Sequence, residues 1–141
     1  MRRAVKSSWF AAAAVLWMGV IFFLSSMHGD SLGPDTFTVN FAKKFGHVML
    51  FGVLSILYYF ALNSRKTAGR VPWTVLVLSF LLTVLYAMTD EYHQSFTPGR
   101  HAAGQDVVID ALGALVFLSF VCLSGISRNG KIDSQGNAPG C

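Results

Sequence analysis

Four apolar stretches dominate this chain, and each provides close to the roughly 20 residues that an α-helix needs to cross a membrane. They are Trp9–Ser26, Phe45–Leu62, Pro72–Thr89 and Val107–Gly125. We therefore predict an all-α fold, a four-helix transmembrane bundle. The first stretch is expected to stay as an anchor, because Leu24–Met27 offers no clear small-x-small cleavage site.

Composition agrees with a membrane protein. Of 141 residues, 53% are hydrophobic and only 13% are charged, whereas soluble domains are about one quarter charged. The net charge of +4 forms no basic stripe with interleaved aromatic residues, so nucleic acid is not an expected partner. The two cysteines show no metal-ligand spacing, and we expect no metal site and no cofactor.

Lysine and arginine set the expected orientation. Eight basic residues lie before the first stretch, between the second and third, or after the fourth: Arg2, Arg3, Lys6, Arg65, Lys66, Arg70, Arg128 and Lys131. Only Lys43, Lys44 and Arg100 fall on the other side. The positive-inside rule therefore predicts that both termini are cytoplasmic. We expect a membrane domain over residues 1–126 and a disordered cytoplasmic tail over residues 127–141.

This topology brings separated polar residues to one depth. His47 opens the second stretch, Glu91 follows the third, and Asp106 and Asp110 open the fourth. In four antiparallel helices these ends share the outer leaflet. Ionisable groups within spans are rare without a function, so we expect the functional site there.

Helical spacing places these residues on inward faces. Three sets follow a helical stripe: Asp106, Asp110, Gly113 and Phe117; His47, Phe51, Leu54 and Tyr58; and Ala87, Glu91 and Gln94 if the third helix continues past Thr89. A lipid-facing Asp at the bilayer centre would cost about 2.5–3.5 kcal/mol. We therefore expect Asp110 to turn inward beside Gly113, where another helix can approach closely.

The link between the third and fourth stretches carries a turn signal. Pro98 followed by Gly99 favours a type II turn, which would project Arg100 back over the helix ends. Arg100 could then bridge Glu91 or Asp106, or bind an anionic group as a planar fork. The alternative is that Asp90, Glu91 and Arg100 are ordinary interfacial charges. We expect His93 and His101 to be solvated loop residues.

These motifs resemble the VanZ-like family of membrane proteins. The resemblance rests on Lys44-x-x-His47, on Asp90-Glu91-x-x-Gln94-x-x-x-Pro98-Gly99-Arg100, on Asp106-x-x-x-Asp110-x-x-Gly113, and more weakly on Leu24-Ser25-Ser26. It implies a small multi-pass protein of the bacterial inner (cytoplasmic) membrane. It also implies a role in resistance to the glycopeptide antibiotic teicoplanin, separate from the enzymes that rebuild the peptidoglycan precursor terminus. The family commonly has Asn at the position of Asp110.

Three functions stay open. In the first, an outer-leaflet site binds an anionic or amphiphilic ligand, such as a lipid-linked cell-wall precursor or a lipoglycopeptide. Its ligand-binding candidates are Arg100, Lys44, Gln94, Pro98 and Gly99. In the second, an intramembrane enzyme uses Glu91, Asp106, Asp110 and His47 for acid–base catalysis, or less favourably as metal ligands. In the third, the polar cluster only holds the bundle together. Membrane lipids are expected partners under all three functions, and a homo-oligomer stays open.

Overall fold

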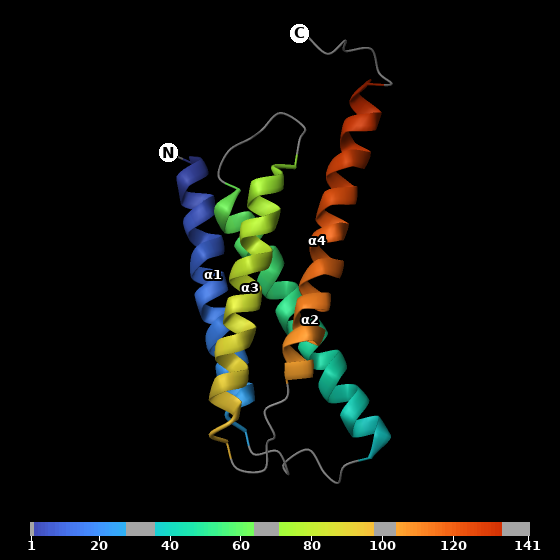
Figure 1. Ribbon diagram of the computed structural model, residues 1–141. Coiled ribbons are helices and arrows are strands. Elements are labelled where there is room, and N and C mark those ends of the chain that lie inside the picture. The colour runs from blue at the N-terminus through green and yellow to red at the C-terminus, as the bar shows by residue number, and fades with distance from the viewer. Residues whose placement is uncertain (1, 28–35, 64–70, 98–103, 134–141) are drawn as a thin grey trace.

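The computed structural model describes residues 2–27, 36–63, 71–97 and 104–133, and these form four helices and no strand. The helices are α1 (Arg2–Ser25), α2 (Phe37–Leu62), α3 (Trp73–Gln94) and α4 (Gly104–Asp133) (Figure 1). Each contains a segment long and apolar enough to cross a membrane: Ser7–Ser25, Phe37–Leu62, Trp73–Gln94 and Gly104–Ser124. The predicted all-α bundle with four candidate spans is confirmed.

The helices alternate in direction. α1 and α3 run one way and α2 and α4 run the other, so the start of α1 and the end of α4 lie at the same end of the bundle (Figure 1). We call the opposite end, where α1 and α3 end and α4 begins, the site end. α2 contacts all three other helices, and its contact with α4 is the most extensive.

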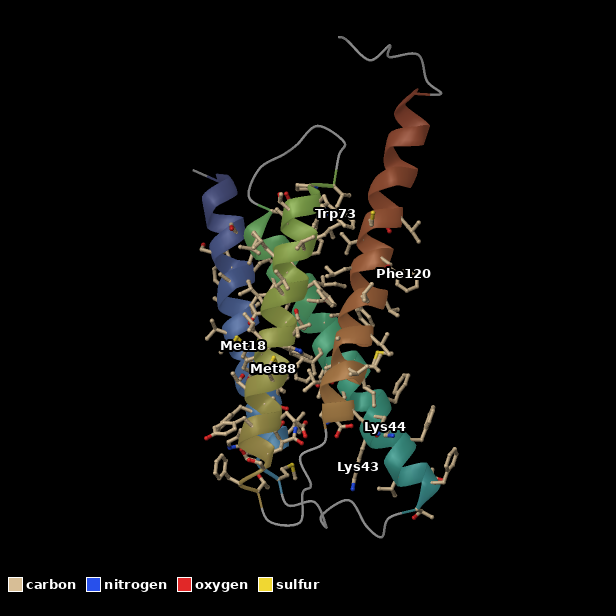
Figure 2. The ribbon with its side chains drawn as sticks, viewed as in Figure 1. Met18, Lys43, Lys44, Trp73, Met88 and Phe120 are labelled. Atoms are coloured by element: carbon tan, nitrogen blue, oxygen red, sulfur yellow. The ribbon has the colours of Figure 1, made fainter. Side chains whose placement is uncertain are left out.

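The core is small and the outer surface is apolar. Buried Ala14, Ile21, Phe51, Leu54 and Ala87 form one cluster in which α1, α2 and α3 meet. Large apolar side chains also cover the outside, as Phe120 of α4 does (Figure 2). A contiguous apolar exterior is rare on a soluble monomer and is what a lipid-facing surface requires.

Two glycines allow α2 and α4 to approach closely. A Cβ atom added to Gly113 would lie 2.6 Å from the carbonyl oxygen of Val48. One added to Gly52 would lie 2.5 Å from Cδ2 of Phe117. The expected close approach at Gly113 is therefore present, and it brings the backbone of α4 against α2 one turn beyond Asp110.

The helices extend beyond the expected apolar stretches. α1 begins at Arg2 rather than near Trp9, α2 begins at Phe37 rather than near Phe45, and α3 continues past Thr89 to Gln94. α4 continues to Asp133, so residues 127–133 are helical where a disordered tail was expected. The reason is that a helix is defined by its backbone hydrogen bonds, and polar residues such as Lys are good helix formers beyond the apolar stretch.

Candidate functional site

Buried polar side chains at the site end find their partners on other helices. Deeper in the bundle the buried hydroxyl groups of Ser55, Ser79 and Thr83 each donate to a carbonyl of their own helix. At the site end the buried polar residues of the described part of the chain are Ser25, Asp90, Glu91, Gln94, Thr97 and Asp110. Burying such groups is costly unless they are partnered, so their cross-helix contacts must specify how the helices pack.

His47 and Asp110 join α2 to α4. Nδ1 of His47 lies 3.1 Å from Oδ1 of Asp110, and the side-chain exposures of the two residues are 18% and 2%. The imidazole lies nearly parallel to the ring of Phe51, with an interplanar angle of 11° and ring centroids 6.1 Å apart. The stripes on the two helices therefore face each other, and Asp110 turns inward as its spacing indicates.

A second network joins α1 to α3. The hydroxyl of Ser25 donates to Oδ2 of Asp90 at 2.8 Å, and Nε2 of Gln94 donates to the same oxygen at 2.7 Å. Nε2 of Gln94 also lies 3.3 Å from Oγ of Ser25. Because Asp90 and Gln94 are one helical turn apart, their side chains lie on the same face of α3 and hold the last residue of α1.

The two networks act on each other electrostatically. The charges of Asp90 and Asp106 both act on His47 and on Asp110. Asp106 lies in the first turn of α4, where a negative charge also interacts favourably with the helix dipole. Glu91 is buried beside Asp90 on α3. The structure thus brings together the predicted His47, Asp106 and Asp110, with Glu91 and Gln94 on the adjoining helix.

The predicted cationic residues are only partly covered. Lys44 is exposed on α2, three residues before His47, and lies towards the site end with Lys43 (Figure 2). Arg100, Pro98 and Gly99 fall outside the described residues, as does His101. The turn and its bridging arginine therefore stay predictions.

The assignment of His93 to a solvated loop was wrong. His93 lies in the last turn of α3, and its ring centroid is 4.3 Å from that of Phe22 on α1. Its Nδ1 atom is buried without a hydrogen-bond partner. The helix continues past Thr89, so this side chain packs on α1 instead of leaving the bundle.

Sequence reasoning missed the cross-helix role of Asp90 and Ser25. Asp90 looked like an interfacial charge, and a serine at the end of a span is common. The available signal was the i, i+4 spacing of Asp90 and Gln94, one turn beyond the inward-facing Ala87. A helical stripe through Ala87, Asp90 and Gln94 predicts that the carboxylate of Asp90 faces the interior of the bundle.

The arrangement offers an oriented imidazole and several hydrogen-bond acceptors. A histidine whose Nδ1 is held by a carboxylate presents Nε2 for proton transfer or hydrogen bonding. The carboxylates of Asp90, Asp106 and Asp110 can accept hydrogen bonds from a bound group. Among the described residues no group of three or more His, Cys, Asp or Glu side chains has the geometry of a metal site.

Comparisons with known proteins bear on this site. A protein-family model described as VanZ/LLP1 matches residues 10–125, which includes every residue of both polar networks. A search of the curated proteins and a search of the solved structures each gave no match.

Proposed function

We propose that this chain, which belongs to the VanZ/LLP1 family, binds an amphiphilic ligand at the site end of its bundle and thereby supports resistance to teicoplanin-type glycopeptides. The ligand would be a lipid-linked cell-wall precursor or a lipoglycopeptide. Such a molecule keeps its hydrocarbon chain in the bilayer and its polar group at the membrane surface, and the proposal puts the two networks, which lie at one end of the bundle, at that depth.

One observation carries this proposal. Side chains from all four helices form two polar networks, Ser25–Asp90–Gln94 and His47–Asp110, at one end of the bundle. Apolar packing would hold four helices together at lower desolvation cost, so a set of buried carboxylates favours a role in binding or chemistry.

The proposed orientation places this end outside the cytoplasm. The opposite end of the bundle contains the start of α1 and the end of α4 (Figure 1). Arg2, Arg3 and Lys6 lie in the first turns of α1, and Arg128 and Lys131 lie in the last turns of α4. The positive-inside rule assigns such an end to the cytoplasmic face of the inner membrane.

Within this site the basic and acidic residues would have separate tasks. Lys44, at the exposed margin, and Arg100 would bind a phosphate or carboxylate of the ligand, with Pro98 and Gly99 shaping the link. Glu91, Gln94 and Asp106 would position its neutral polar groups. The buried networks would fix the helices around it.

A resistance assay with matched variants tests the proposal. Wild type, Arg100→Lys and Asp106→Asn are expressed in a teicoplanin-sensitive bacterium at equal membrane levels. Arg100→Lys keeps the charge but loses the planar guanidinium, and Asp106→Asn loses the charge while keeping the shape, so both should lower resistance. Ser119→Ala, which removes an exposed hydroxyl bonded within α4, is the control and should not. If Arg100→Lys is mild and only the amount of folded protein changes, the cluster is structural and the proposal fails.

The His47–Asp110 pair favours a second candidate, acid–base catalysis on an envelope lipid. A carboxylate that orients an imidazole is the arrangement of many general bases, and Glu91 and Asp106 would supply the acid. Purified protein should then consume a candidate lipid, and Glu91→Gln should abolish turnover. Turnover that persists in this variant would contradict the assignment of Glu91.

A further inference from the structure

One oxygen of the buried Asp90 carboxylate has no hydrogen-bond partner. The residue is only 4% exposed, and Oδ2 receives both donors of its network, from Ser25 and Gln94. Oδ1 receives none. A buried carboxylate oxygen left unpaired costs free energy, so a native structure that keeps one gives a reason to look for a bound donor.

Asp90 belongs to a group of acidic residues at the site end. Its carboxylate acts electrostatically on Asp110, together with the carboxylate of Asp106 and the imidazole of His47. The imidazole of His47 carries less charge than these three carboxylates, and the basic Lys43 and Lys44 lie one helical turn before it on α2. A bound cation would lower the electrostatic cost of holding these carboxylates together in a site of low dielectric.

The unpaired Oδ1 needs a hydrogen-bond donor and the acidic cluster needs a positive charge, and a primary ammonium group supplies both. We propose that Oδ1 of Asp90 binds a primary ammonium group of the amphiphilic ligand, so that this group sits between the Ser25–Asp90–Gln94 network and the His47–Asp110 pair. The inference rests on the proposed function and names the chemistry of the ligand. The ammonium would be that of an aminolipid headgroup or of an amine on a lipid-linked peptide.

Other ligand groups satisfy the site less well. A hydroxyl would supply the missing hydrogen bond but no charge, and a quaternary ammonium would supply charge but has no N–H to donate. The geometry of a metal site is not found among the described side chains. A primary ammonium has three donors, so after bonding to Asp90 it can still donate to a neighbouring carboxylate.

Asp90→Asn tests this inference directly, because it changes the hydrogen-bonding role of one side-chain atom from acceptor to donor. The amide oxygen of Asn can replace Oδ2 and still accept from Ser25 and Gln94. Its NH₂ group then takes the place of Oδ1, so an acceptor becomes a donor and the negative charge is lost. The fold should survive, and a thermal unfolding scan of the purified variant verifies this. Ser95→Ala, which removes an exposed hydroxyl that bonds within the end of α3, is the matched control.

The probe is a series of lipids with the same acyl chains, and binding to purified full-length protein is measured by native mass spectrometry. Phosphatidylethanolamine carries a primary ammonium, phosphatidylcholine a quaternary one, and phosphatidylglycerol only hydroxyls. Wild type and Ser95→Ala should prefer phosphatidylethanolamine over both others by at least about tenfold, the value of one charge-assisted hydrogen bond. In Asp90→Asn this preference should disappear.

The outcomes separate cleanly. Equal binding of phosphatidylcholine, a preference for phosphatidylglycerol, or a preference that survives Asp90→Asn would each overturn the assignment. Competition by glycerophosphoethanolamine would indicate that the amine headgroup is sufficient, and its failure to compete would place part of the affinity in the acyl chains. If Asp90→Asn loses the preference for the amine lipid but gives normal resistance, the result would contradict only the proposed function. Loss of resistance in Asp106→Asn with no amine preference in wild type would contradict only this inference.

Discussion

At the scale of single residues, the site depends on buried groups that satisfy one another. The carboxylate of Asp110 is almost fully buried, and its observed partner is an imidazole on another helix. Removing one member of such a pair leaves the other buried and unpaired, whereas removing both leaves an apolar contact. The pair should therefore behave as a unit.

A double-mutant cycle measures this coupling. Asp110→Leu should lower the free energy of unfolding by roughly 1–3 kcal/mol, and His47→Phe by at least as much, because each substitution leaves the other polar side chain buried without its partner. The double variant should lose less than the sum of the two single variants, with a coupling energy of about 0.5–3 kcal/mol. Thermal unfolding in one detergent gives all four values. Additive losses would mean that the two side chains do not interact.

Residue roles could be predicted only where a residue was unusual for its position. Asp110 lies within an apolar stretch, so its inward orientation followed from the cost of exposing it to lipid. Asp90 stands where polar residues are ordinary, and the signal that favours a buried carboxylate over a solvated one is its i, i+4 spacing to Gln94, one turn beyond Ala87. Its partner Ser25 is 65 residues away along the chain, and only the packing of α1 against α3 brings the two together.

At the scale of helices, the glycines of α2 and α4 determine how closely the site residues approach. Gly113 contacts the backbone of Val48, which adjoins His47. The distance between α2 and α4 at this level therefore determines whether His47 can reach Asp110. A larger residue at position 113 would separate the two backbones, since a carbonyl group cannot rotate away as a side chain can.

Gly113→Ala should consequently destabilise the protein, although alanine is the better helix former. We expect a loss of about 1–3 kcal/mol in the free energy of unfolding, because the new Cβ overpacks against α2. Gly19→Ala is the matched control, since a Cβ there meets nothing within 4 Å and should be neutral or slightly stabilising. Apparent melting temperatures of the two variants test this. A Gly113→Ala protein as stable as Gly19→Ala would contradict the close approach.

The existence of each helix was predictable, but its ends were not. Hydropathy identified all four candidate spans because each exceeds the length needed to cross the bilayer. It placed the start of α2 too late, since Lys43 and Lys44 lower the local hydropathy without interrupting the backbone hydrogen bonds of Phe37–Leu62. Residues 127–133 were assigned to a disordered tail for the same reason.

At the scale of the whole molecule, the alternating direction of the helices creates the site. Residues from distant parts of the chain meet because α1 and α3 end where α4 begins (Figure 1). The alternating direction was predictable from four consecutive spans, because each span crosses the membrane in the direction opposite to the one before it. The side of the membrane on which the site end lies is a separate expectation, which rests on the distribution of lysine and arginine.

Labelling of single cysteines tests this orientation. In a background with Cys122 and Cys141 changed to serine, Ser95→Cys places an exposed thiol at the site end, and Lys66→Cys places one between α2 and α3. A membrane-impermeant maleimide should label position 95 in intact cells, and position 66 only after permeabilisation. The reverse pattern would place the site in the cytoplasm and exclude a ligand captured from the outer leaflet.

Mass spectrometry of co-purified lipids tests the central proposal, a polar site that selects one amphiphile at the membrane surface. Wild-type protein and Ser119→Ala should carry a lipid-linked cell-wall precursor well above its share of the host membrane. Asp90→Asn and Asp106→Asn, purified as folded proteins in the same amounts, should not. If all four proteins carry bulk lipids in the proportions of the membrane, the networks at the site end select no ligand and the account is wrong.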